Sequence, residues 1–132
     1  MEIREYKGFD EAEILRLYSD AGWKAYTDDM PALRRGFENS LLVLGAYEDG
    51  MLMGIIRAVG DGATVVLVQD ILVFKEFQRR GVGSALLKEM LSRFGHVRQF
   101  ELVTDNTEKT KAFYRSMGLH ELPEYGCTGF MR

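Results

Sequence analysis

The period of the hydrophobic pattern changes along the 132-residue chain, and these changes predict its elements. Residues 1–6 alternate briefly between polar and apolar side chains, which predicts a first strand. Residues 9–22 and 27–40 instead carry apolar side chains at helical spacing, which predicts two amphipathic helices. Asp10 is a typical N-cap for the first helix, and Pro31 fits the first turn of the second.

Three apolar runs follow, at residues 41–47, 51–59 and 63–74, and glycine-containing turns separate them. Apolar runs joined by such short turns are typical of a meander of antiparallel strands. The third run is apolar on both faces, which predicts a central strand that is covered from both sides.

The last third of the chain alternates between helical and extended patterns. Helices are predicted over residues 81–94 and 106–118, with a strand over 99–105 between them. Residues 119–132 fit a terminal hairpin of two strands. This order of elements predicts an α/β fold in a single domain, residues 1–132, with a mixed, mostly antiparallel central sheet and about four flanking helices.

The composition is that of an ordinary soluble globular protein, with 46% hydrophobic and 28% charged residues. No apolar run approaches the length of a membrane span, and residues 1–14 lack the apolar segment of a secretory leader. Cys127 is the only cysteine, so neither an internal disulfide nor a thiolate-rich zinc site can form. We therefore expect a cytoplasmic protein without a metal, in which Cys127 is a small buried apolar residue.

Charge is distributed unevenly around the formal net value of −3. Residues 1–50 carry six basic and eleven acidic side chains, whereas residues 75–116 carry nine basic and five acidic ones. This asymmetry favours an anion-binding half and a cation-binding half, and the alternative is a solvated mixed surface. Since no basic stripe with interleaved aromatic residues occurs, nucleic-acid binding is not expected.

Residues 76–91, EFQRRGVGSALLKEML, place two arginines and two glycines at the start of a predicted helix. The first N–H groups of a helix lack internal partners, and glycine lets the backbone approach a ligand, so this segment is typical of a phosphate site. A P-loop would require Gly-Lys-Ser/Thr, which is absent. A dinucleotide fingerprint would require a small residue where Leu86 lies. Glu101 is suitably spaced for a ribose contact, but the chain after Gly81 is too short for the repeated strand–helix unit.

Residues 70–83 resemble the cofactor-binding segment of the GNAT superfamily, the acyl-CoA-dependent N-acetyltransferases. The resemblance rests on the strand Asp-Ile-Leu-Val and on the loop Gln-Arg-Arg-Gly-Val-Gly at residues 78–83. The family usually has a proline in the segment between the strand and this loop, where this chain has Lys75. A second motif follows at the expected distance: Asn106, then Ala112-Phe113-Tyr114, then Gly118-Leu119, with leucine in place of the common phenylalanine.

The resemblance covers nearly the whole chain and implies a GNAT-like fold, acetyl-CoA as co-substrate, and direct acetyl transfer to a primary amine of a small molecule. In this family, backbone N–H groups of the loop hold the coenzyme A pyrophosphate, and the preceding strand binds the pantetheine arm. Arg79 and Arg80 either contact phosphates or lie in solvent, and Asn106 either meets the pantetheine or caps its helix. The implied cofactor contacts are Ile71, Leu72, Val73, Gln78, Arg79, Arg80, Gly81, Val82, Gly83, Ser84, Asn106 and Phe113.

The chemistry requires a base and an acid, because an amine with the lysine pKa of about 10.4 is neutral in only about one molecule in 10³ at pH 7. Asp70 is the candidate base, since a carboxylate within VVLVQDILV is costly to bury unless it is hydrogen-bonded or used. Its alternatives are a bond to a neighbouring backbone amide, or a water that carries the proton. Tyr114 matches the family tyrosine near the coenzyme sulfur and is the candidate acid, unless its ring simply packs on the helix. His96 and His120 occupy loop or edge positions.

The connector between the first two predicted helices is the candidate acceptor site. Trp23, Tyr26 and Asp28 place aromatic rings beside carboxylates, which suits an amine on an apolar or aromatic body. The alternative is an aromatic residue packed on the core, with Asp28 and Asp29 opening the next helix. The residues of the motif also resemble those of serotonin N-acetyltransferase-like proteins of plants, which points to small arylalkylamines. Polyamines, amino sugars and protein amino groups stay open as acceptors.

Two other functional classes stay open, and so does the state of assembly. A catalytically silent acyl-CoA sensor would keep the loop without depending on Tyr114, and a nicotinamide-dependent oxidoreductase would bind a dinucleotide instead. The predicted terminal hairpin could pair across a two-fold axis and give a homodimer.

Overall fold

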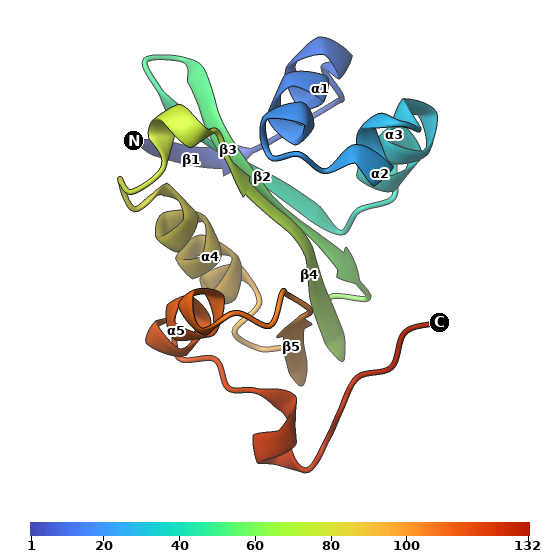
Figure 1. The fold of residues 1–132 in the computed structure, drawn as a ribbon, viewed down its shortest axis with the longest axis vertical. Coiled ribbons are helices and arrows are strands. Elements are labelled where there is room, and N and C mark those ends of the chain that lie inside the picture. The colour runs from blue at the N-terminus through green and yellow to red at the C-terminus, as the bar shows by residue number, and fades with distance from the viewer.

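The computed structural model describes residues 1–132 and is built around one five-stranded sheet (Figure 1). The strands lie in the sheet in chain order, and all neighbours are antiparallel except the last pair, which is parallel. This confirms the predicted mixed, mostly antiparallel sheet. The strands are β1 (Glu2–Glu5), β2 (Leu42–Glu48), β3 (Met51–Gly60), β4 (Val65–Val73) and β5 (Gln99–Leu102).

Helices cover both faces of the sheet, with α1, α2 and α3 on one face and α4 and α5 on the other (Figure 1). The predicted Asp10 cap is confirmed, since its side chain accepts a hydrogen bond from the N–H of Glu13 at 3.1 Å. None of the helices is long and apolar enough to cross a lipid bilayer. The helices are α1 (Glu11–Asp20), α2 (Lys24–Thr27), α3 (Met30–Glu38), α4 (Val82–Arg93) and α5 (Glu108–Ser116), with 3₁₀ turns η1 (Lys75–Phe77) and η2 (Leu122–Tyr125).

Two hydrophobic cores form, one on each face of the sheet. On one face α4 packs its row of buried apolar side chains against β2, β3 and β4, and on the other face α1 and α3 do the same. Fully burying one such side chain stabilises the fold by about 1.5–3 kcal/mol. The prediction that the third apolar run is covered from both sides is therefore confirmed. The α4 contribution consists of Val82, Leu86, Leu87 and Met90, and the α1 contribution of Ile14, Leu17 and Tyr18.

A bulge in β4 decides which face each of its side chains meets. Arg57 of β3 is paired with Asp70, and the next residue, Ala58, is paired with Val68, so that β4 contains one extra residue at this point. Val68 and Leu72 would share a face in a regular strand, because side chains alternate. Here Val68 lies in the core against α4, whereas Leu72 lies in the core against α1 and α3. The bulge thus turns Asp70 toward α1 and α2.

Beyond the bulge, one edge of β4 is open. The pairing with β5 covers only residues 65–68 of β4, and the two strands then diverge. The N–H of Phe74 donates to the carbonyl of Met53 on β3. Because backbone groups alternate sides along a strand, Ile71 and Val73 direct theirs away from β3, toward the open edge.

A buried ion pair ties β3 to β4 next to the bulge. The Nε atom of Arg57 lies 2.7 Å from Oδ2 of Asp70, and the two residues are only 5% and 1% exposed. The guanidinium of Arg57 also lies over the ring of Phe37 and donates to the hydroxyl of Ser40 at 3.2 Å. A Cβ at Gly36 would lie 3.2 Å from Nη1 of Arg57, so glycine in α3 leaves room for this side chain.

The structure differs from the sequence prediction at the carboxyl end. Residues 119–132 contain no strand, so the predicted hairpin is wrong, and only the short turn η2 forms there. Reciprocal hydrogen bonds between Glu121 and Glu124, with Pro123 in the first turn, stabilise this turn. The predicted burial of Cys127 is also wrong, because Cys127 is exposed in the segment after η2.

Replacing Gly54 by alanine should destabilise the sheet at β4. A Cβ at this position would lie 2.5 Å from the backbone oxygen of Leu72, which cannot rotate away. We expect Gly54→Ala to lower the free energy of unfolding by about 1–3 kcal/mol, measured by urea denaturation. Gly95→Ala is the control, since a Cβ there meets nothing closer than 3.8 Å. Equal losses in both variants would contradict the close approach.

Removing the buried cation should cost far more stability than removing an exposed one. Arg57→Leu leaves Asp70 buried without its charge partner, so we expect a loss of about 3–5 kcal/mol in the free energy of unfolding. Arg93→Leu is the matched control, because Arg93 pairs with Glu89 at the surface of α4, where an ion pair contributes about 0–1 kcal/mol. The same urea titration measures both, and a small loss in Arg57→Leu would show the pair to be dispensable.

Candidate functional site

The loop between η1 and α4 presents backbone N–H groups without side-chain partners. Arg79 and Gly81 both adopt left-handed conformations, with φ of 66° and 77°. For Arg79 this costs about 1–2 kcal/mol, whereas glycine adopts it freely. Gly81 is also the N-cap of α4 and makes no side-chain capping bond, so the first N–H groups of the helix stay available. Successive N–H groups in such a loop, at the positive end of a helix dipole, form a site for an anion.

A groove of about 550 Å³ runs from this loop to the open edge of β4 and is closed on its other side by α5. It brings together ten of the residues that the sequence motifs single out, from three separate parts of the chain. The lining residues are Ile71, Val73, Phe77, Gln78, Arg79, Gly81, Val82, Gly83, Ser84, Lys109, Thr110, Phe113 and Tyr114.

Gly83 keeps the groove open between β4 and α5. A Cβ at this position would lie 3.9 Å from both Phe113 and Val73, which is ordinary contact distance. A single methyl group would therefore fit, but a longer side chain would occupy the space between the two walls. The side-chain amide of Gln78 lies near the same wall and donates to the carbonyl of Val73 at 3.3 Å.

Three predicted cofactor contacts lie outside the groove lining. The side chain of Leu72 is 4% exposed in the core against α1, and its backbone groups face β3, so Leu72 is directed away from the groove. Arg80 is exposed, lies over the ring of Phe77, and has Glu48 within 3.5 Å. Asn106 is exposed at the turn before α5.

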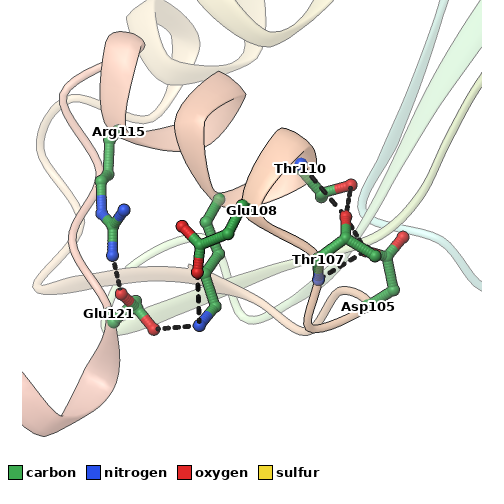
Figure 2. Close-up of polar contacts among 7 residues, drawn as sticks. Asp105, Thr107, Glu108, Thr110, Arg115 and Glu121 are labelled. Atoms are coloured by element: carbon green, nitrogen blue, oxygen red, sulfur yellow. Dashed lines mark hydrogen bonds and ion pairs between the residues drawn. The ribbon is translucent and has the colours of Figure 1, made fainter.

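The start of α5 is capped by Thr107, so the alternative role of Asn106 as a helix cap is wrong. Thr107 is the extended residue before the helix, and its hydroxyl accepts from the N–H of Thr110 at 3.3 Å. The same hydroxyl contacts a carboxylate oxygen of Asp105 at 2.7 Å (Figure 2). The side chain of Asn106 therefore takes no part in capping α5.

Sequence reasoning missed three groove residues, Phe77, Lys109 and Thr110. Lys109 adds a positive charge to a groove that already starts at a helix N-terminus. The available signal was helical spacing, because residues three and four positions apart lie on one face. Lys109 and Thr110 precede Phe113 and Tyr114 by four residues and therefore share their face of α5.

Tyr114 lies in the groove wall with its phenol partly buried. Burial raises the pKa of Tyr114 above its ordinary value, a hydrogen bond with Thr104 acts in the opposite direction, and the charge of Asp105 raises the pKa further. The phenol is therefore protonated at neutral pH and can donate a hydrogen bond or a proton. Its ring packs edge-to-face on Phe113, with centroids 5.0 Å apart.

Asp70 lies on the other face of β4, at the centre of a hydrogen-bonded cluster. The hydroxyl groups of Tyr18 and Tyr26 donate to its carboxylate at 2.8 and 2.9 Å, in addition to the bond from Arg57. Its partners are thus side chains of α1, α2 and β3, and not the neighbouring backbone amide of the alternative interpretation. Burial, followed by the charge of Asp70, raises the pKa of Tyr18.

Tyr26 connects this cluster to solvent. Its hydroxyl donates to Asp70 and accepts from the side-chain amide of Gln69 at 3.1 Å, and Gln69 is exposed. Burial raises the pKa of Tyr26, while the hydrogen bond from Gln69 lowers it. Asp70 itself is 1% exposed, so the half-buried Tyr26 is the side chain that links its carboxylate to the surface.

Of the three predicted acceptor residues, Trp23 and Tyr26 lie together, whereas the carboxylate of Asp28 is paired elsewhere. The rings of Trp23 and Tyr26 are stacked with centroids 6.0 Å apart. The carboxylate of Asp28 pairs with Lys24 at 2.9 Å on the exposed side of α2. Asp29 caps α3 by accepting from the N–H of Ala32, as the alternative interpretation of these acids proposed.

Tyr114 and Asp70 do not contact one another. Tyr114 packs against the core on the α4 face of the sheet, whereas Asp70 bonds to residues of α1 and α2 on the opposite face. Asp70 lies on the part of β4 that no longer pairs with β5, and the groove that Tyr114 lines reaches the same part at Ile71 and Val73. No group of three or more His, Cys, Asp or Glu side chains is arranged to hold a metal ion.

Comparison with known proteins identifies the family. Residues 39–120, more than half of the chain, match the family described as acetyltransferase (GNAT) domain. A GNAT family acetyltransferase from Streptococcus pneumoniae is 37% identical, with a TM-score of 0.88 over 99% of this chain and 96% of that one. A comparison with curated protein sequences gives no match.

More distant solved structures share the fold. An aminoglycoside acetyltransferase from an uncultured soil metagenomic sample is 20% identical, with a TM-score of 0.68 over 91% of both chains. A transcriptional regulator from Bacillus halodurans is 15% identical, with a TM-score of 0.76 over 99% of this chain and 97% of that one. Together with the loop, the groove and the open strand edge, the family match shows that this chain belongs to the GNAT acetyltransferases, a family that uses acetyl-CoA.

Proposed function

We propose that this acetyltransferase moves the acetyl group of acetyl-CoA directly to a primary amine of a small molecule. The observation that carries the proposal is the groove, because it joins an anion site, an unpaired strand edge and a protonated phenol in one continuous space. These three parts correspond to the phosphates, the pantetheine arm and the thioester end of coenzyme A.

The residues of the groove fit the parts of coenzyme A in order. The N–H groups of residues 79–84 would hold the pyrophosphate, with Arg79 and Lys109 adding positive charge. Ile71 and Val73 would offer backbone groups to the pantetheine amides, and Phe113 would pack against the arm. Arg80 can turn to a phosphate at little cost, because its exposed pair with Glu48 contributes about 0–1 kcal/mol.

Tyr114 is proposed as the acid of the reaction. As the amine nitrogen bonds to the thioester carbon and the carbon–sulfur bond breaks, the phenol donates its proton to the departing sulfur. A phenol with a raised pKa is the protonated donor that this step needs. The open N–H groups of β4 stabilise the negative charge that develops on the carbonyl oxygen.

Asp70 is proposed as the base, acting through Tyr26. A substrate cannot touch a carboxylate that is 1% exposed, but it can reach the half-buried hydroxyl of Tyr26. The amine passes its proton to this hydroxyl while the hydroxyl proton moves to Asp70. The transfer accompanies bond formation at nitrogen, because the amine proton becomes more acidic as the bond to the thioester carbon forms.

The stacked rings of Trp23 and Tyr26 support an acceptor with a flat apolar or aromatic body. Small arylalkylamines are therefore the proposed class. Amino sugars form the second candidate class, because one protein of the same fold is an aminoglycoside acetyltransferase. Thiol release from acetyl-CoA in the presence of each amine class distinguishes the two.

The groove should bind acetyl-CoA and should depend on the small residue in its wall. Calorimetric titration is expected to give micromolar binding of acetyl-CoA and none of NADH, since the loop lacks the dinucleotide pattern. Gly83→Leu should weaken acetyl-CoA binding at least about 100-fold, or about 2.7 kcal/mol. Gly95→Leu, beyond the far end of α4, is the control and should bind normally. Normal binding by Gly83→Leu would place the coenzyme elsewhere.

The phenol of Tyr114 should matter for turnover and not for binding. Tyr114→Phe keeps the packed ring and removes the proton, so we expect kcat to fall about 10²- to 10⁴-fold with little change in acetyl-CoA affinity. Because burial raises the pKa of Tyr114, this acid should cause no loss of wild-type kcat below about pH 10. Tyr125→Phe, at an exposed tyrosine outside the groove, is the control. Unchanged kcat in Tyr114→Phe would exclude the acid role, and a protein with binding but no turnover would be a sensor.

A further inference from the structure

The last residue of α1 is an acid in a place that is unfavourable for one. Asp20 ends the helix, where the helix dipole favours a positive charge, and the last turn of α1 contains no basic residue. Its carboxylate accepts a hydrogen bond from the backbone N–H of Lys75 at 2.7 Å. The two residues are 55 positions apart in the chain, so this bond joins the end of α1 to the start of η1.

Lys75 lies where the chain crosses from one face of the sheet to the other. Phe74 packs against the core on the α1 face, whereas Phe77 packs against the core on the α4 face. The loop between η1 and α4, residues 78–81, follows directly and lines the groove. The carboxylate of Asp20 therefore holds this crossing from outside, three residues before the loop begins.

Turn hydrogen bonds connect this anchor to the loop. The N–H of Phe77 donates to the carbonyl of Phe74 at 2.8 Å. The N–H of Gln78 donates to the carbonyl of Lys75 at 3.2 Å. The next residue, Arg79, has a φ of 66°, and a residue other than glycine keeps such a conformation only where its surroundings enforce it. The conformation of the loop therefore depends on a fixed η1.

Few other polar contacts hold this segment from outside. Only two side-chain hydrogen bonds join residues 75–81 to elements other than β4. The second, between Arg80 and Glu48, is exposed and 3.5 Å long. The bond to Asp20 is much shorter, and a hydrogen bond to a carboxylate is stronger than one between neutral groups. Asp20 is thus the main polar restraint that another element places on η1.

We propose that Asp20 is a positioning residue for acetyl-CoA. By holding the N–H of Lys75, it keeps residues 78–81 in the conformation that receives the phosphates of the coenzyme. This inference rests on the proposed function of the groove. Asp20 itself lies outside the groove lining and acts only through the backbone of η1.

The inference gives residue 75 a specific chemical role. Only a residue with a backbone N–H at this position can bind Asp20, and proline has none. Proline would instead restrain the position from within the chain, because its ring fixes φ near about −65°. The backbone already suits proline, since Lys75 is the first residue of η1 and Phe74 has a ψ of 138°.

Charge alone would make Asp20 act in the opposite direction. Coenzyme A is an anion, so removing a neighbouring carboxylate should strengthen its binding if Asp20 acted only through its charge. Removing a bond that fixes the loop should instead weaken binding, because the loop then has to be ordered when the ligand binds. A hydrogen bond to a charged group corresponds to at least about 10-fold in an equilibrium constant.

Calorimetric titration with acetyl-CoA is the first test. Asp20→Ala should raise the Kd roughly 10-fold with little change in the urea midpoint, since alanine suits the end of a helix better than an acid. Glu38→Ala is the matched control, because Glu38 is an exposed acid that also ends a helix, and it should bind like the wild type. If the wild type binds and Asp20→Ala binds equally or more tightly, this inference alone fails. A wild type that does not bind would overturn the proposed function as well.

A double-mutant cycle with residue 75 tests the hydrogen bond itself. In a Lys75→Pro background there is no N–H to hold, so adding Asp20→Ala should leave the Kd unchanged. In a Lys75→Ala background the N–H is kept, and adding Asp20→Ala should again raise the Kd roughly 10-fold. Equal losses in both backgrounds would overturn the proposal. Asp20→Asn keeps an acceptor oxygen and should bind acetyl-CoA more tightly than Asp20→Ala, and equal binding by these two variants would also overturn it.

Discussion

The ion pair between Arg57 and Asp70 is the interaction on which the arrangement around β4 depends. Its two charges are almost fully removed from water, a loss that is offset only when every donor and acceptor is satisfied. Two phenols, a serine hydroxyl and the ring of Phe37 complete that set. Because these groups come from α1, α2, α3 and the turn after it, the pair fixes three helices against the sheet. No buried side-chain polar atom is left without a partner.

One extra residue in β4 has two consequences, one for a buried polar cluster and one for an open groove. It turns Asp70 toward α1 and α2, where the carboxylate finds its partners. It also turns Ile71 and Val73 toward the opposite face of the sheet. The strand beyond the bulge has also left β5, so its backbone groups face a groove. The polar cluster and the groove are therefore two products of the same local irregularity, placed on opposite sides of one strand.

The sequence predicted the features that arise from neighbouring residues and missed those that arise from distant ones. Periodicity located the strands and helices, and the spacing of two motifs located most of the groove. The partners of Asp70 are 13, 44 and 52 residues away along the chain, and no local pattern indicates them. The terminal hairpin was wrongly predicted because apolar residues at a chain end look alike whether they pair within the chain or stay exposed. Lys109 was missed because no motif includes it, although its helical face contains Phe113 and Tyr114.

Gly36 lies inside a helix, where glycine is less favourable than alanine by about 0.5–1 kcal/mol. It is tolerated because its missing side chain is the space that the guanidinium of Arg57 fills. The residue at position 36 therefore depends on the residue at position 57. A descendant that shortens residue 57 frees position 36 to become alanine and to strengthen the helix, whereas a descendant that keeps the arginine has to shift its guanidinium by a few tenths of an ångström to accept a Cβ there. Related chains should accordingly change these positions together, 21 residues apart in sequence and in direct contact in space.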